Sequence, residues 1–346
     1  MYESFYGLTG KPFQLNPDPA FYFGSRGHKR AFAYLQYGVY QSEGFIVITG
    51  EIGAGKTTIV RSLFEQLDRD RLVAAQLVST QLDADDMLRS VSAAFGLPAK
   101  SVDKATLLAS LEAFLCQLAI DGKRALLVVD EAQNLTPRAV EELRMLSNFQ
   151  LGDQALLQSF LIGQPELRDM MHGQQMQQLR QRVIASYHLG PMDKAETQAY
   201  IEHRMLHVGW KGDPSIDSAA FDLIHTLSGG IPRRINTICN RLLLAGYLQE
   251  KHAFGTEDVH AIAKEIREEL GPETALASVA VARARDANVT PPPTMLQDSG
   301  AMLARLREMD ERIDRLEKTV GSAVDLLHRL LHPDRPSKPG TPASRG

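Results

Sequence analysis

The sequence predicts an α/β protein in which helices flank a parallel β-sheet, followed by a small all-helical domain and a C-terminal coiled-coil segment. Through residue 190, short runs rich in β-branched residues alternate with amphipathic helical patterns, which is typical of a parallel sheet covered on both faces. From residue 194 to residue 270 only helical periods follow. Near the C-terminus, apolar residues repeat with alternating three- and four-residue spacing, which predicts a heptad seam.

Five short apolar runs are predicted to form the strands of the sheet. Their length and β-branched composition favour buried strands over helices. The strands are expected at 45–49, 72–78, 125–129, 156–162 and 185–189, and the helices at 28–41, 56–67, 83–95, 103–120 and 136–148. Because ligands bind at the carboxyl edge of such sheets, chemistry is expected where these strands end.

Composition also predicts the domain boundaries. Residues 1–190 are expected to form the α/β domain and residues 191–270 the helical domain, with helices at 196–208, 218–227, 233–250 and 256–270. Residues 271–300 are rich in Ala, Pro and small polar residues and predict a flexible linker. Residues 301–332 predict a short coiled coil or amphipathic helix, and a seam used only for self-association fits the same pattern. Residues 333–346 are expected to be disordered.

Charge and cysteine content narrow the classes of function. A net charge of −4 over 346 residues gives no general attraction to nucleic acid or anionic lipid. Cys116 and Cys239 lie far apart within apolar helical patterns, which favours reduced, buried thiols over a metal site or a disulfide. No cleavable signal and no membrane-spanning apolar stretch are visible. We therefore expect a cytoplasmic protein that reaches the inner membrane only through partners.

A glycine-rich loop follows the first predicted strand. Its residues fit the phosphate-binding motif G-x-x-x-x-G-K-[ST]: Gly50, Glu51, Ile52, Gly53, Ala54, Gly55, Lys56 and Thr57. Glycines let the backbone wrap around phosphate, and the next helix adds its positive N-terminal end. Lys56 is expected at the β- and γ-phosphates, Thr57 as a Mg²⁺ ligand and Thr58 near the α-phosphate. The position of the motif between a predicted strand and a predicted helix argues against a chance match.

Two acids, Asp130 and Glu131, end the third predicted strand. Asp130 is expected to hold Mg²⁺ through water, and Glu131 to orient and deprotonate the attacking water. A strand that ends in Asp-Glu is common, and by itself it is equally consistent with a structural role. Next to a phosphate loop it predicts ATP hydrolysis, since the glutamate separates hydrolases from P-loop proteins that only bind or switch.

Gln164 closes the fourth predicted strand. A polar side chain at this edge would touch the γ-phosphate or position water. Such residues also occupy ordinary turns, and Pro165 follows directly, so a turn residue is the competing interpretation.

Four arginines are further candidates. Arg180 and Arg182 precede the fifth predicted strand, and in an oligomer one of them would reach the γ-phosphate of a neighbouring subunit. Arg233 and Arg234 begin a helix of the second domain, from which they would swing onto bound nucleotide. Arginine is usually a solvated surface residue, so spacing alone does not select among the four.

Taken in order, these motifs resemble the AAA+ superfamily, and more closely the secretion-type ATPases of the general secretion pathway protein A family. Within that family the chain is similar to the subgroup associated with PEP-CTERM/exosortase loci. The segments that carry the resemblance span about residues 1–270: Phe5-Tyr6-Gly7-Leu8 with Pro12-Phe13, the block 44–50, and the blocks 129–135, 162–168 and 229–236.

The resemblance implies roles for several residues. It places Gln164 at the sensor 1 position, Arg233 at sensor 2 and Arg182 at the arginine-finger position, with Arg180 as its rival. Asn16 and Pro17 would shape the adenine side of an ATP site, and the helical domain would act as a lid over it. Family members best known in secretion carry a membrane segment and a peptidoglycan-binding domain after the ATPase. Here the heptad segment follows instead, so wall binding is not expected.

The leading interpretation is a Mg-ATP hydrolase that forms homo-oligomers and drives conformational change in a cell-envelope export system. For the subgroup, the resemblance implies polysaccharide synthesis and export coupled to PEP-CTERM protein sorting. One alternative is a DNA-acting ATPase of the transposition or initiator kind, which the negative charge and the lack of a basic arm disfavour. The other is a nucleotide-gated scaffold with little turnover, which Glu131 disfavours.

Overall fold

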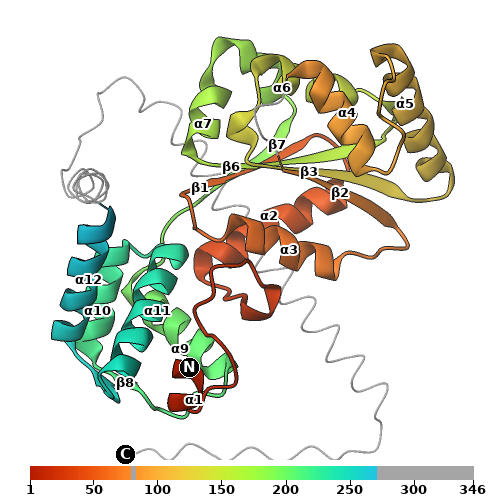
Figure 1. Cartoon of the computed structure of the whole chain (residues 1–346). Helices are drawn as coiled ribbons and strands as arrows, with labels where there is room; N and C mark the ends of the chain where they lie inside the picture. Colours follow the sequence, from red (N-terminus) through yellow and green to blue (C-terminus); the bar gives the residue numbers. More distant parts are fainter. Residues whose placement is uncertain (79–82, 271–346) are drawn as a thin grey trace, which may run out of the picture. The chain divides into compact units, whose positions relative to one another are not determined.

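The computed structural model describes residues 1–78 and 83–270 (Figure 1). The predicted linker at 271–300, the predicted coiled coil at 301–332 and the predicted disordered tail at 333–346 lie outside the described residues. No helix that the structure describes combines the length and apolarity needed to cross a membrane.

A five-stranded parallel sheet forms the centre of the first part of the chain, as predicted. Its strand order is β2-β3-β6-β1-β7. The strands are β1 (Phe45–Gly50), β2 (Leu72–Val78), β3 (Arg124–Asp130), β6 (Leu157–Gly163) and β7 (Val183–Leu189). β1 and β3 both pair with β6 in parallel register, so the phosphate loop after β1 and the acids at the end of β3 reach the same edge of the sheet.

Helices cover both faces of this sheet. Figure 1 shows α2 (Arg26–Gln41) and α3 (Lys56–Gln66) on one face, and α4 (Ala84–Ala94), α5 (Lys104–Ile120), α6 (Pro137–Leu146) and α7 (Pro165–His172) on the other. Alternate side chains of β1 are buried in two separate cores. Phe45 and Val47 pack with α4 to α7. Ile46 and Ile48 pack with α2 and α3. This period of two along a fully buried strand is what a sheet between two helical layers requires.

Short elements complete the α/β part. They are η1 (Pro19–Phe21), η2 (Ala132–Asn134), η3 (Gln174–Met176), α8 (Gln177–Arg180), and the hairpin of β4 (Gln150–Leu151) and β5 (Gln154–Ala155). Thr136 caps α6, since its side chain accepts a hydrogen bond from the Ala139 N–H, and Pro137 is the first helical residue, as predicted.

Four helices form the second part of the chain: α9 (Lys194–His207), α10 (Ser218–Ser228), α11 (Pro232–Leu248) and α12 (Thr256–Leu270). The prediction of helices only is wrong in one detail, because β8 (Ser215–Ile216) pairs in parallel with β9 (Ala253–Phe254). Strands of two residues are too short to show a period of their own in the sequence.

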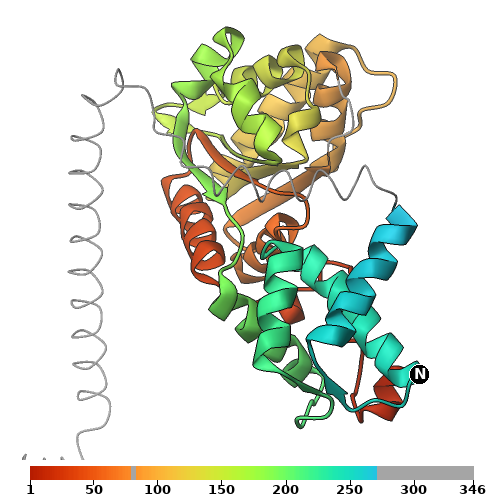
Figure 2. The same ribbon diagram turned by 90° about the vertical axis from the view of Figure 1, so that its left-hand side faces the viewer.

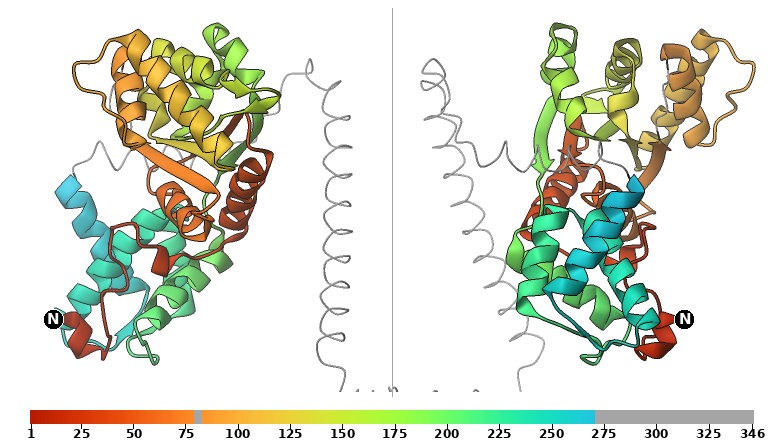
Figure 3. Two further views of the ribbon diagram at one scale, coloured as in Figure 1. Left: turned by 90° about the vertical axis from the view of Figure 1, so that its right-hand side faces the viewer. Right: turned by 60° about the vertical axis from the view of Figure 1, so that its left-hand side comes forward.

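The N-terminal segment packs with the helical part, which differs from the expectation that residues 1–190 form one domain. Helix α1 (Tyr2–Phe5) begins this segment, and Figures 2 and 3 show it beside the helices α9 to α12. Tyr2, Tyr6 and Phe13 are buried in the same core as the helices α9 to α12. The Tyr2 hydroxyl also donates to Asn240 Oδ1 at 2.8 Å. The aromatic side chains of the first residues are thus part of the core of the helical part.

Both cysteines are free thiols, and their burial differs. Cys239 is buried in the core of the helical part, whereas Cys116 is half-buried at the edge of the core beneath α5.

Candidate functional site

The phosphate loop between β1 and α3 depends on glycine for its path. Gly53 and Gly55 have φ values of +80° and +97°, a conformation that other residues rarely adopt. A Cβ atom on Gly53 would lie 2.3 Å from Arg233 Cβ, and one on Gly55 would lie 2.7 Å from His28 Nε2. The loop is therefore pressed against two other elements, and only glycine fits at either position.

Lys56, the first residue of α3, is buried beneath this loop. Its ammonium group donates to Gly50 O at 2.8 Å and to Glu51 O at 3.0 Å. Burial lowers the pKa of Lys56, while the carboxylates of Glu131 and Asp130 oppose that shift. A cation held by main-chain carbonyls alone is available to bind an incoming anion.

Thr57 and Asp130 meet where α3 starts and β3 ends. The Thr57 hydroxyl donates to Asp130 Oδ2 at 2.9 Å. Asp130 is buried, and burial raises its pKa, although the bonds from Thr57 and from the Glu131 N–H oppose the shift. A hydroxyl beside a carboxylate, next to a phosphate loop, is a suitable donor set for Mg²⁺.

Glu131 is held by two glutamine side chains. Its Oε2 accepts from Gln164 Nε2 at 3.0 Å and from Gln133 Nε2 at 2.5 Å. Gln133 Oε1 also accepts from the Gln164 N–H at 3.0 Å, which closes a three-residue cluster. Burial would raise the pKa of Glu131, but these hydrogen bonds and the charges of Lys56 and Arg233 outweigh it, so the pKa is lowered. The carboxylate is thus ionised and fixed in direction.

Gln133 is a member of this cluster that sequence reasoning missed. The sequence contained a signal for this role: Gln133, which has an amide side chain, lies only two residues after Glu131. Glu131 itself has a positive φ of 54°, and this left-handed turn starts η2, which brings Gln133 back toward the carboxylate.

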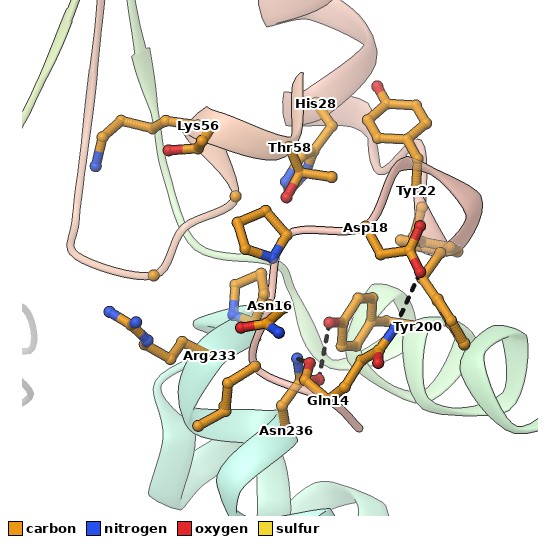
Figure 4. A pocket seen from close by; sticks show the side chains of 18 of the residues that line it. Gln14, Asn16, Asp18, Tyr22, His28, Lys56, Thr58, Tyr200, Arg233 and Asn236 are labelled. Atoms are coloured by element: carbon orange, nitrogen blue, oxygen red, sulfur yellow. Dashed lines mark hydrogen bonds between the residues drawn. The ribbon is translucent and has the colours of Figure 1, made fainter. Parts of the chain in front are cut away.

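A cavity of about 250 Å³ opens beside the loop and contains most of the predicted binding residues (Figure 4). Those that line it are Asn16, Pro17, Ile52, Gly53, Gly55, Lys56, Thr57, Thr58, Glu131 and Arg233. Asp130 and Gln164 do not line the cavity themselves. They contact lining residues, because Asp130 is bonded to Thr57 and Gln164 to Glu131. Gly50, Glu51 and Ala54 belong to the loop without lining the cavity.

Helix α11 of the helical part reaches the phosphate loop directly. The main-chain N–H of Arg233 donates to Gly53 O at 3.1 Å. The Arg233 side chain is exposed and lies on the same side of the cavity as Lys56 in Figure 4. Arg234, the neighbouring candidate, is exposed and does not line the cavity.

The opposite wall of the cavity comes from the N-terminal segment. Arg61 on α3 donates to Pro17 O at 2.5 Å, and Gln14 Nε2 donates to Asp18 Oδ2 at 3.0 Å. These bonds fix the segment that contains Asn16, with both Asn16 and Pro17 facing the cavity.

A buried polar network supports this wall, and sequence reasoning missed it. Arg204 on α9 donates to Pro12 O at 2.5 Å and to the Tyr200 hydroxyl at 2.9 Å, and that hydroxyl donates to Asn236 Oδ1 at 2.8 Å. The Arg204 guanidinium also lies 4.6 Å from the centre of the Phe21 ring. No carboxylate among the described residues forms an ion pair with Arg204. Tyr200 lies one helical turn before Arg204, but the sequence gave no signal for the contact with Pro12 O, because that oxygen lies 192 residues away.

Arg180 and Arg182 lie away from the cavity. Arg182 Nη1 donates to Ser147 O at 3.1 Å and to Ser147 Oγ at 2.8 Å, at the end of α6. Arg180 Nη1 donates to Met171 O at 2.5 Å and to Gly173 O at 2.8 Å. Within one chain neither arginine lines the cavity, so a role toward a neighbouring subunit stays a prediction.

The residues of the site fit a magnesium-bound nucleotide. The loop offers a concave backbone that a Cβ would obstruct, a buried lysine ends at the loop, and a hydroxyl–carboxylate pair lies beside it. The cavity continues from these groups toward the residues of the N-terminal segment that also line it.

Comparisons with known proteins agree with this geometry. Residues 39–171 match a family model described as an AAA domain. In solved structures, the Aeropyrum pernix ORC2 protein in its ADP form has a TM-score of 0.55 at 15% identity, covering 73% of this chain and 72% of that chain. Cdc6p from Pyrobaculum aerophilum has a TM-score of 0.55 at 16% identity, covering 76% and 70%. The fold is thus that of the P-loop AAA+ ATPases, a nucleotide-binding class.

One curated protein is similar in sequence over most of the chain. The general secretion pathway protein A of Aeromonas hydrophila is 39% identical over 268 residues, which cover 77% of this chain and 48% of that protein. This chain therefore spans about half the length of the relative that it matches.

Proposed function

We propose that this chain binds and hydrolyses Mg-ATP. The observation that carries the proposal is the arrangement at one sheet edge: Lys56 below the phosphate loop, Thr57 bonded to Asp130, and Glu131 fixed by Gln164. Three adjacent parallel strands, β1, β3 and β6, deliver these groups to one place.

Different residues of the chain would bind the phosphates, hold Mg²⁺ and accept the proton of the attacking water. The loop amides and Lys56 would bind the phosphates, and Thr57 and Asp130 would hold Mg²⁺, which when bound neutralises charge on the phosphate oxygens. Glu131 would accept a proton from the attacking water, and its lowered pKa keeps it ionised for that purpose. Gln164 and Gln133 would keep the Glu131 carboxylate aimed at that water.

The lid and the neighbouring subunit would complete the site. Arg233 begins the helix whose N–H is bonded to the phosphate loop, so a change in the angle of the helical part would move its guanidinium relative to the phosphates. In a homo-oligomer Arg182, or its rival Arg180, would act on the nucleotide of the adjacent subunit. Asn16 and Pro17 would face the adenine.

We further propose a process for this activity, on the basis of the similarity to general secretion pathway protein A. The chain would be an ATPase of that family that acts from the cytoplasm on a cell-envelope export system. The resemblance of its motifs to the PEP-CTERM/exosortase-associated subgroup favours polysaccharide export as that process. Contact with the inner membrane would come through protein partners.

A Glu131→Gln variant tests the hydrolytic assignment. The amide is nearly isosteric but cannot take a proton, so phosphate release should fall at least about a hundredfold while ATP affinity remains. Glu166→Gln, which removes an exposed carboxylate at the start of α7, is the matched control and should keep full turnover. Normal turnover by Glu131→Gln would contradict the role of Glu131.

The same variant tests the process, because it should accumulate in the ATP-bound assembly. Affinity purification of Glu131→Gln from its host with ATP should enrich inner-membrane export or polysaccharide-synthesis proteins over the Lys56→Ala variant. Equal recovery with both variants would contradict nucleotide-dependent docking.

A further inference from the structure

His28 connects the start of α2 to the phosphate loop. Its ring is buried, with Nδ1 2.7 Å from Ser25 Oγ and Nε2 3.0 Å from Ala54 O. A carbonyl oxygen only accepts, so Nε2 must carry the proton, and Nδ1 then accepts from the Ser25 hydroxyl. Burial lowers the pKa of His28, which favours this neutral form with one donor and one acceptor nitrogen.

The bond to Ala54 O determines how the next amide points. The C=O and N–H of one trans peptide face opposite directions, so a carbonyl held toward His28 turns the Gly55 N–H away from it. Gly55 is the last loop residue before Lys56 and has a φ of +97°. Because glycine adopts positive and negative φ about equally readily, this residue does not by itself fix the orientation of the peptide. Loop amides in this position are the groups that cradle the phosphates.

We propose that His28 is a positioning residue that fixes the Ala54–Gly55 peptide so that the Gly55 N–H faces the bound phosphates. The inference rests on the proposed nucleotide site and assigns one of its residues a role that neither the motif nor the predicted acids contain. His28 lines the cavity beside the loop and bonds to the loop carbonyl of Ala54, and the proposal has it act through that bond (Figure 4).

The segment that carries His28 is itself well anchored. Ser25 caps α2, because its Oγ accepts from the His28 N–H at 3.3 Å. Next to it, the main-chain N–H of Arg26 donates to Glu196 Oε1 at 2.8 Å, and the Arg26 guanidinium is paired with Asp193. Asp193 is the N-cap of α9 and Glu196 lies in its first turn, so α9 fixes the start of α2, which in turn contacts the phosphate loop through His28.

The packing around the ring leaves little freedom for it to move. Gly55 is so close that a Cβ there would lie 2.7 Å from Nε2, and the Tyr22 ring packs edge-on with its centroid 6.3 Å away. Both ring nitrogens have polar partners, as burial of an imidazole requires, and one of those partners is a carbonyl of the phosphate loop.

The test is ADP affinity, measured by calorimetry on the full chain for three variants. His28→Leu keeps the bulk and removes the donor, and it should weaken ADP binding about tenfold. His28→Gln restores an N–H at a similar distance and should recover most of that loss. His225→Leu is the matched control. His225 Nδ1 likewise lies at hydrogen-bond distance from a hydroxyl, 3.0 Å from that of Thr197, but His225 belongs to the helical part and does not line the cavity.

A measurement on the unaltered chain covers the case in which His28→Leu does not fold. Long-range ¹H–¹⁵N spectra of the imidazole ring report which nitrogen is protonated. A proton on Nε2 of His28 supports the proposal, whereas a proton on Nδ1 alone overturns it, since Nε2 could not then donate to Ala54.

The outcomes separate this inference from the proposed function. If the unaltered chain binds neither ADP nor ATP, both fall together. If it binds ADP and the folded His28→Leu variant binds equally well, only the role of His28 is overturned. If His28→Leu and His28→Gln are equally weak, ring packing and not the donated hydrogen bond is responsible, and the proposal is likewise overturned.

Discussion

The two walls of the cavity are built in different ways. The two walls are named after the groups that we propose they bind. The phosphate wall consists of residues 52–53 and 55–58 and of Glu131, which follow the ends of β1 and β3, with Asp130 directly behind them. The base wall joins the N-terminal segment at 14–23 to Tyr200, Arg204 and Asn236 of the helical part. The strands of the sheet bring the residues of the phosphate wall together. The base wall forms only because the N-terminal segment packs on helices that follow it by almost 200 residues.

The walls also differ in their electrostatics. The phosphate wall concentrates ionisable groups, because Lys56, Asp130 and Glu131 lie at one edge of the sheet. The base wall has main-chain carbonyls, amides and aromatic rings around the buried cation of Arg204. We therefore expect changes to the phosphate wall to affect turnover and phosphate binding, and changes to the base wall to affect nucleoside recognition and stability.

The largest effect should come from Asp130→Asn on the phosphate wall. Removing the charge beside Thr57 takes away the carboxylate that would hold Mg²⁺, so hydrolysis should fall about a hundredfold or more. Nucleotide binding measured with a chelator present should match that of the unaltered chain, because the loop and Lys56 are intact. If Asp130→Asn bound nucleotide more weakly than the unaltered chain with the chelator present, Asp130 would have a structural role instead.

A second prediction concerns the contact between the loop and the lid. Gly53→Ala would place a Cβ 2.3 Å from Arg233 Cβ, so ADP affinity should fall about tenfold as the loop and α11 are forced apart. Gly96→Ala is a matched control with the same φ of +80° and open space around the new Cβ. Both variants should lose about 1 kcal/mol of folding free energy from backbone strain. Only Gly53→Ala should change ADP affinity, and equal affinities would contradict the contact.

The contrast between the walls explains what the sequence predicted. The parallel sheet, the ends of β2 at Leu72 and Val78, and the placement of Lys56 and Thr57 next to Asp130 follow from short local patterns. Strand ends in a parallel sheet must share an edge, so residues on separate strands are brought together without any further information. That is why the acids at 130–131 could be assigned to the phosphate loop from the sequence alone.

Residues whose partners are distant in sequence could not be found in this way. Arg204 and Tyr200 look like ordinary helix residues, and His28 looks like a surface histidine at a helix start. Their roles depend on how the N-terminal segment packs, and local composition does not encode that packing. The strands β8 and β9 were not predicted because each has only two residues, too few to show an alternation of apolar and polar residues.

The base wall can be tested with Arg204→Met. The Pro12 and Tyr200 oxygens would lose a donor in a buried site, so the free energy of unfolding should fall by about 2 kcal/mol. ADP affinity should fall about fivefold because the N-terminal segment is less well ordered, whereas inorganic pyrophosphate should bind unchanged. Arg241→Met, which removes a half-buried arginine of α11 paired with Glu269, is the control. An equal loss for ADP and pyrophosphate would show that Arg204 does not act on the nucleoside side.

The smallest effect is expected for Arg26→Ala at the junction of α2 and α9. The Arg26 side chain is 81% exposed, so its pairing with Asp193 is screened by solvent and salt. ADP affinity should change by less than about twofold, and the difference should vanish in high salt. A large loss of ADP affinity would contradict this expectation, because the Arg26 side chain would then contribute more than the main-chain bond from Arg26 to Glu196.

The central claim is that the buried Lys56 and the loop above it bind the phosphates of a nucleotide. The most direct measurement is the calorimetric affinity of Lys56→Ala for ATP, with thermal unfolding recorded to confirm that the variant is folded. We predict that ATP affinity falls at least about a hundredfold, since a charge-assisted contact to phosphate is lost in a partly desolvated site. ATP affinity equal to that of the unaltered chain in a folded Lys56→Ala variant would contradict the account.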